Sequence, residues 1–176
     1  TMSMPHAHLV ALCTDLGISA AQGAAMLSLL LGLGFLCRQL WGVISDRIGA
    51  LLTLLISGVA QMTTFSGFIV ADNVPGLFAV SAAFGIAFSG LVPAYVLAVR
   101  EYFPAREASW RVPALLLMSG SGMATGSWLA GVIYDHYAYY APAFMAGVGF
   151  NLVNILLLSI LVLRWRLTRL PRPQAA

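Results

Sequence analysis

Lysine is absent from this sequence, and charged residues of either sign are scarce. All nine basic residues are Arg, six residues are Asp or Glu, and together they make up 9% of the 176 residues. Soluble domains carry about 25% charged residues. With 60% hydrophobic residues and a mean hydropathy of +0.90, the composition excludes a disordered chain, a secreted disulfide scaffold and an ordinary soluble enzyme. We therefore predict a polytopic membrane protein.

Cysteine is also rare, and the two that occur, Cys13 and Cys37, lie in apolar runs. We expect them to be reduced packing residues rather than a disulfide or a metal pair. No charged segment, short apolar stretch and cleavage site open the chain, so no signal peptide is expected. The net charge of +3 is too small to indicate a nucleic-acid partner. No phosphate loop or metal-ligand set is visible, so we expect no cofactor, no metal and no enzymatic activity.

Long apolar stretches dominate the chain instead. About 20 apolar residues cross the hydrocarbon core of a bilayer, and the continuous apolarity of these stretches excludes the alternation of a β-barrel. Residues 1–14 are too short to span and are expected to be the end of a truncated transmembrane helix. The sequence therefore predicts an all-α membrane protein with a truncated first helix and five transmembrane helices near residues 20–41, 50–71, 76–99, 112–134 and 141–163.

The charges are sorted between the predicted turns. Eight of the nine Arg residues follow the first, third and fifth spans, whereas the intervening turns carry only Asp72 and Asp135 as charged residues. The positive-inside rule places the Arg-bearing turns in the cytoplasm. The C-terminus is then cytoplasmic, and we expect the Arg-rich tail, residues 164–176, to fray near anionic lipid headgroups.

The most specific motif is the octapeptide Gly42-Val-Ile-Ser-Asp46-Arg47-Ile-Gly49, which lies in the predicted cytoplasmic turn between the first two spans. We expect Gly42 to let neighbouring helices approach closely and Gly49 to permit a sharp reversal of the chain. Asp46 is expected to face the positive end of a helix N-terminus, and Arg47 to reach the inner headgroups.

This octapeptide resembles the Gly-x-x-x-Asp-Arg-x-Gly signature of the major facilitator superfamily, although Ala50 and Leu51 replace the two basic residues that usually follow. The Gly-rich stretch 126–135 is similar to the end of the eleventh helix in these transporters. The resemblance implies that the chain is the C-terminal six-helix half of a twelve-helix carrier, which needs its missing N-terminal half as a partner. It also implies a conformational, or gating, motif made of Gly42, Asp46, Arg47 and Gly49.

The beginning of the chain, Met4-Pro-His-Ala-His-Leu-Val10, is similar to the monocarboxylate and oxalate/formate branch of that superfamily. This resemblance implies a secondary carrier that moves small organic anions, mono- or dicarboxylates, by alternating access of its two halves. The expected location is the lipid bilayer of a bacterial inner membrane. Two alternatives stay open, namely an exporter of drugs or other metabolites, and a small complete membrane protein that acts by binding partners.

Arg38 is the one charged residue inside a predicted span, about 12 Å along the helix axis from Asp46. A charge at that depth indicates a functional site, and the alternative is an Arg that snorkels to the inner headgroups. Gly34 and Gly42 share its helix face, and such a small-residue face usually meets protein or a cavity. The resemblance implies that Arg38 binds the substrate carboxylate. Gly34 stands where monocarboxylate transporters carry an Asp tied to proton coupling, so coupling through that pair is not expected.

His8 and Tyr95 are weaker candidates for substrate binding. His8 and His6 are two residues apart and point to different helix faces, which argues against a shared metal. Tyr95 follows Pro93, which is expected to kink the third span. Beyond that kink Tyr95 can reach a cavity, and packing in the core is the alternative.

Asn151 is the third weaker candidate. It shares a helix face with Asn154, three residues further along the last span. We expect both amides to form hydrogen bonds between helices rather than to bind substrate, and we expect the same of Gln61 in the second span.

Overall fold

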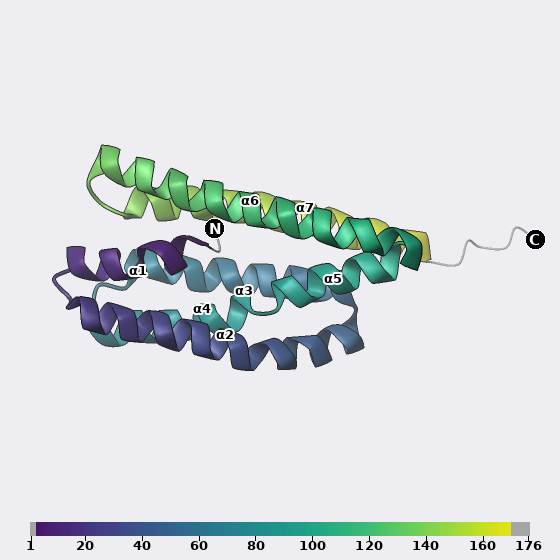
Figure 1. Ribbon diagram of the computed structural model, residues 1–176, viewed down its shortest axis with the longest axis horizontal. Helices are drawn as coiled ribbons and strands as arrows, with labels where there is room; N and C mark the ends of the chain where they lie inside the picture. The colour runs from purple at the N-terminus through teal and green to yellow at the C-terminus, as the bar shows by residue number, and fades with distance from the viewer. Residues whose placement is uncertain (1–2, 170–176) are drawn as a thin grey trace, which may run out of the picture.

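The computed structural model describes residues 3–169, without the side chains of residues 168 and 169. Over these residues the chain is all-helical. Helices α6 and α7 run side by side along one edge of the bundle, and α2 lies along the opposite edge (Figure 1). The seven helices are α1 (Ser3–Asp15), α2 (Ala20–Ile48), α3 (Ala50–Val70), α4 (Val74–Phe88), α5 (Leu91–Tyr102), α6 (Ala105–Tyr137) and α7 (Ala141–Arg169).

Among residues 3–169, five segments are long and apolar enough to cross a membrane, with α4 and α5 together forming one of them, Val74–Tyr102. The helices extend beyond the apolar stretches at the end where the Arg residues gather. Helix α2 continues to Ile48, and α6 already begins at Ala105. The helices continue past the expected boundary of the hydrocarbon core of the bilayer, because Arg, Glu and Ala are good helix formers in water as well.

The expectation of a frayed tail from residue 164 onward is wrong for its first part. Helix α7 continues without a break through residues 164–169. Four of these six residues are Arg or Leu, which are good helix formers, and no proline occurs among them. The remaining tail, residues 170–176, lies outside the described residues.

The predicted kink of the third span is confirmed as a break between α4 and α5 at Ser89 and Gly90. Pro93 lies in the first turn of α5, where its missing N–H costs no intrahelical bond. The break leaves carbonyls at the end of α4 without helical partners. Ser57 of α3 donates to the Ala87 carbonyl at 2.6 Å, and the Trp41 indole of α2 donates to the Ile86 carbonyl at 2.8 Å.

An aromatic cluster forms the core between α3, α4 and α7. Phe65 of α3 contacts Phe144 of α7 with a centroid distance of 5.0 Å, and Phe68 contacts Phe84 of α4 at 5.9 Å. These rings are almost completely buried. Rings in such tilted or edge-on geometry attract one another beyond their apolar burial, so this cluster ties the three helices together.

Helices α2 and α4 approach so closely that their backbones touch. A Cβ atom added to Gly85 would overlap the backbone carbonyl oxygen of Leu30, and one added to Gly34 would lie 3.0 Å from the Phe88 ring. Gly90 is equally restricted, because its Cβ position lies 2.5 Å from the indole of Trp41. Small residues at such crossings permit van der Waals contact along the backbone, which is how helices associate in lipid.

Helices α2, α6 and α7 present large apolar surfaces to the outside of the described bundle. On α2, Phe35 and Leu36 are 73% and 65% exposed, and the buried positions form one narrow stripe. On α6, Ala130 is the single residue that is buried among the described residues. In a membrane protein these faces meet lipid or further protein.

We predict that Gly85→Ala lowers the thermal stability of the chain. The added methyl group would have to displace the backbone of α2 at Leu30, and overpacking of this kind costs about 1–3 kcal/mol. Gly32→Ala on α2 is the matched control, because nothing lies within 4 Å of its Cβ position. The midpoints of thermal unfolding in the same detergent should therefore fall for Gly85→Ala only, and equal midpoints would show that α2 and α4 do not pack in this way.

Candidate functional site

The octapeptide of residues 42–49 forms the last two turns of α2 and the junction to α3. Gly49 has a φ of +86°, a conformation that favours glycine, and its N–H donates to the Ser45 carbonyl at 2.9 Å. Helix α3 starts at the next residue, Ala50. The reversal expected at Gly49 is therefore present, and it joins two membrane-length helices through a single residue.

A carboxylate does face a helix N-terminus at this junction, but it is not Asp46. Both carboxylate oxygens of Glu101, near the end of α5, lie 3.3 Å from the backbone nitrogen of Ala50 and accept from its N–H. A negative charge at this position offsets the positive end of the α3 dipole. Asp46 is exposed instead. The expectation that Asp46 faces a helix N-terminus is wrong within residues 3–169, because Glu101 occupies that place.

The expected close helix contact at Gly42 is also absent from the described part of the chain. Nothing lies within 4 Å of the Cβ position of Gly42. Arg47, one turn further on, is exposed, as is Asp46. The end of α2 thus presents an open glycine and two opposite charges on its surface.

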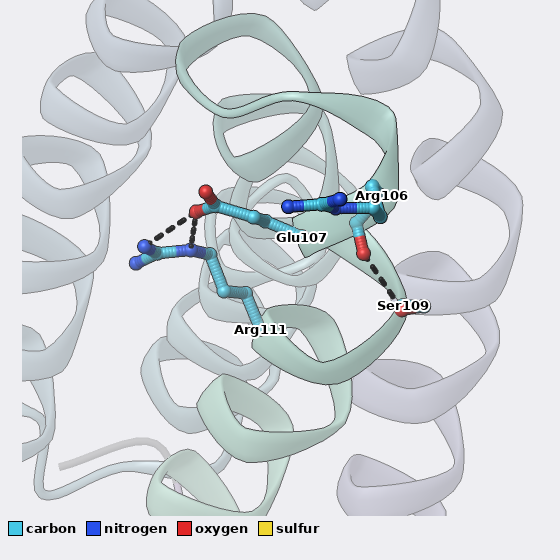
Figure 2. Close-up of polar contacts among 4 residues, drawn as sticks. All are labelled: Arg106, Glu107, Ser109 and Arg111. Carbon is cyan, nitrogen blue, oxygen red and sulfur yellow. Dashed lines mark hydrogen bonds and ion pairs between the residues drawn. The ribbon is translucent and has the colours of Figure 1, made fainter.

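The corner between α5 and α6 carries further charges, which are partly paired. The Arg111 guanidinium binds the Glu107 carboxylate at 2.6 Å, one helical turn apart, and Ser109 donates to the Arg106 carbonyl at 3.0 Å (Figure 2). The guanidinium of Arg111 also lies 3.9 Å from the centre of the Phe103 ring. These contacts stabilise the first turns of α6, which precede its apolar stretch.

Arg38 lies on α2, exposed, between the packed Gly34 and the open Gly42. No ion pair or hydrogen bond joins its guanidinium to another of the residues 3–169. Of the two glycines on the expected small-residue face, Gly34 therefore packs against protein and Gly42 does not. Arg38 stands at the edge of the α2–α4 contact with its five N–H donors available.

His8 lies on α1, and protein groups bind both of its ring nitrogens. Nε2 lies 3.1 Å from the Ser127 carbonyl of α6, and Nδ1 lies 3.2 Å from the Tyr140 hydroxyl. Because a carbonyl can only accept, Nε2 carries the proton and Nδ1 accepts from Tyr140. Burial, and then the nearby Asp15, raise the pKa of Tyr140, so its hydroxyl stays protonated as this donor. His8 thereby links α1 to α6 and to the turn before α7.

Tyr95 and Asn151 come together at one pocket, which Arg38 and His8 do not line. This pocket has a volume of about 470 Å³ and lies between α3, α5, α6 and α7. Asn151 is 2% exposed, and neither polar atom of its amide has a hydrogen-bond partner. The expectation that Asn151 bonds across helices is therefore wrong among the described residues. Gln61 and Asn154 line the same pocket.

Two contributors were missed by reasoning from the sequence. Nothing in the order of the chain indicates that Glu101, 51 residues away from Ala50, reaches the start of α3. Gln61 was assigned to interhelical bonding, yet the nitrogen of its amide has no partner among residues 3–169. Within those residues no group of three or more His, Cys, Asp or Glu side chains is placed to hold a metal ion.

Comparison with known proteins adds to this geometry. No match was found among curated proteins. A family model described as Major Facilitator Superfamily matches residues 1–176, the whole of the sequence. The all-helical bundle with five membrane-length segments is consistent with part of that fold. The chain therefore belongs to the major facilitator superfamily, whose members are transporters in the membrane.

Proposed function

We propose that this chain is the C-terminal six-helix half of a secondary carrier that moves small organic anions, mono- or dicarboxylates. The observation that carries the proposal is the state of Arg38. It is a permanently charged side chain on an apolar, membrane-length helix, and no anionic partner binds it within residues 3–169. A charge in that position is costly unless a counter-ion compensates it. We assign that role to the carboxylate of the substrate.

The chemistry of the side chain fits this assignment. A guanidinium is planar and presents a fork of N–H donors that binds a carboxylate through two parallel hydrogen bonds. Gly34 lies one helical turn before Arg38 on α2 and adds no side chain on that side of it. Its exposure leaves the other side accessible to a solute.

Alternating access requires a second six-helix half against which this one can rock. The exposed apolar faces of α2 and α6 are the surfaces that we assign to that contact. The open Gly42 and the exposed Asp46 and Arg47 lie at the end of the same α2 face, where they can form and break contacts as the halves move. In this proposal residues 42–49 gate the cytoplasmic side of a carrier in a bacterial inner membrane, with its C-terminus in the cytoplasm.

We predict that Arg38→Gln weakens anion uptake by the complete carrier about tenfold or more. A hydrogen bond to a charged group contributes about 1.5–3 kcal/mol, and each 1.4 kcal/mol is a factor of ten in affinity. Arg38→Lys should recover only part of the loss, because an ammonium group cannot form the bidentate fork. Concentration-dependent uptake of labelled lactate, pyruvate, formate and oxalate, normalised to the amount of carrier in the membrane, measures the effect.

Arg106→Gln is the control for loss of positive charge alone, because Arg106 lies at the start of α6 outside the predicted apolar stretch. Uptake by this variant should equal that of the wild type. If Arg38 only snorkels to headgroups, Arg38→Gln will also keep its affinity, and the assignment fails. Uptake of a cationic drug that is insensitive to Arg38→Gln, with no anion uptake at all, would favour the exporter instead.

We also predict the sidedness of the two turns that flank Val74–Tyr102. In a background without Cys13 and Cys37, a Cys at Asp72 should react with an impermeant maleimide in intact cells. Asp72 is chosen because the neighbouring Asn73 caps α4 through a 2.7 Å bond to the Gly76 N–H. A Cys at Ala105 should react only after the membrane is permeabilised, since the Arg-rich corner lies inside. The opposite pattern would invert the topology.

A further inference from the structure

Among residues 3–169, the end of the bundle opposite the Arg-rich end carries only negative charges. It is formed by the end of α1, the turn between α3 and α4 and the turn between α6 and α7, which lie at the same end of the molecule in Figure 1. The charged side chains described there are Asp15, Asp72 and Asp135, and no Arg lies among them. Carboxylates gathered without basic residues attract cations to such a surface.

A pocket of about 450 Å³, the size that holds a small ligand, lies at this end between α1, α3, α6 and α7. Asp15 and Asp72 both line it, whereas Asp135 does not. Both lining carboxylates belong to exposed residues, and so does the Tyr139 ring, so these groups reach the open space. Because these exposed residues belong to a helix end and to turns, the pocket opens at the end of the bundle toward water. It does not open on the apolar faces of α2 and α6.

The two lining carboxylates have neutral partners but no counter-charge. Asp72 accepts from the Asn73 amide at 3.3 Å, and Asp15 interacts with the hydroxyl of Tyr134. Within residues 3–169 neither carboxylate forms an ion pair. A carboxylate offers about four lone-pair sites, so most of the accepting capacity of both groups remains for a ligand. A cation would supply the positive charge that the described lining lacks.

Tyrosine rings form the wall of the pocket beside the carboxylates. Tyr134 stacks on Tyr140 with a centroid distance of 4.3 Å, which restricts the orientation of both rings. Tyr134 is half-buried and Tyr139 is 55% exposed, so both retain accessible surface at the pocket. An aromatic face attracts a cation and also packs against apolar groups. Carboxylates beside tyrosine rings therefore favour an ammonium ion with an apolar body over a hydrated metal ion.

We propose that this pocket is a binding site for a small organic ammonium ion, held by the carboxylates of Asp15 and Asp72 and by the rings of Tyr134 and Tyr139. The ion enters from the side of the membrane opposite the Arg-rich end and bridges α1 to the two turns. The site is separate from the anion site proposed above, because Arg38 does not line it. The proposal stands on the lining of the pocket and does not depend on what Arg38 binds.

The test uses the chain of 176 residues in dodecyl maltoside, whose headgroup is uncharged, with phenethylammonium chloride as the probe. Saturation-transfer NMR should detect the ammonium ion bound to the wild type. The alcohol 2-phenylethanol has nearly the same shape without the charge, and it should not compete with the probe. Sodium lactate, at constant ionic strength, should not displace the probe either. Competition by the alcohol would show that the pocket binds an aromatic ring and not an ammonium group, and would overturn the proposal.

Substitutions locate the site. Asp15→Asn and Asp72→Asn should each weaken binding of the probe about threefold, and the double variant about tenfold, because exposed ion pairs are individually weak. Tyr139→Leu should also weaken it about threefold, since it removes a ring from the wall. Asp135→Asn is the matched control, because it removes the same charge from the same end but outside the pocket, and the affinity should be unchanged.

Three results would contradict the proposal. Equal weakening by Asp135→Asn would show that the overall charge of this end, and not the pocket, attracts the ion. No signal from the folded wild type would show that there is no site. Lower melting temperatures of both Asn variants without ligand would show that the carboxylates serve the fold, because Asn keeps an oxygen that accepts a hydrogen bond.

The headgroup of phosphatidylethanolamine carries the same ammonium chemistry as a soluble ion. Repeating the titration in nanodiscs that contain this lipid distinguishes the two sources. Unchanged affinity for the probe shows that the ligand is a soluble ion. Loss of probe binding in these nanodiscs, with binding retained in detergent, assigns the pocket to the headgroup, and both results place an ammonium group in it.

Discussion

The contact between the backbones of α2 and α4 at Gly85 organises the bundle around it. It brings the Trp41 indole to the Ile86 carbonyl at the end of α4, an oxygen that also accepts from the Ser89 hydroxyl at 2.8 Å. Together with Ser57 from α3, Trp41 makes the break at Ser89 and Gly90 tolerable in a region where water is scarce. A larger residue at Gly85 would separate α2 from α4 and remove the Trp41 bond to the Ile86 carbonyl. The break between α4 and α5, close to Pro93 and Tyr95, therefore lies against α2 at Trp41.

Polar side chains in this bundle fall into two groups. Some form hydrogen bonds within the protein and others do not, and this difference indicates function. His8 and Ser57 make hydrogen bonds within the protein and join helices. Arg38, Gln61 and Asn151 retain unused hydrogen-bonding capacity within residues 3–169. The groups concerned are the charged guanidinium of Arg38 on the exposed side of α2 and the neutral amides of Gln61 and Asn151 between α3 and α7. We assign an anion to the first place, because a charged guanidinium selects a solute of opposite charge.

Properties set by neighbouring residues could be predicted from the sequence, and properties set by packing could not. Apolar length indicates the transmembrane helices, Pro93 indicates the break nearby, and Gly49 indicates the reversal, because each depends on the local chain. The place of Glu101 against Ala50 depends on how α5 packs beside α3, 51 residues away. The openness of Gly42 likewise depends on which helices lie opposite, and periodicity along α2 does not contain that information. The meeting of Tyr95 and Asn151 at one pocket has the same cause.

The geometry at the junction of α2 and α3 leaves the charges of Asp46 and Arg47 available for a partner. Because Glu101 already accepts from the Ala50 N–H, the start of α3 needs no help from Asp46. Asp46 and Arg47 are then exposed at the end of a helix whose neighbouring face, at Gly42, is open as well. A rocking interface needs contacts that are strong in one state and absent in the other, and charges not already used inside one half can supply them. In our proposal the internal bond of Glu101 is what makes the external role of Asp46 and Arg47 available.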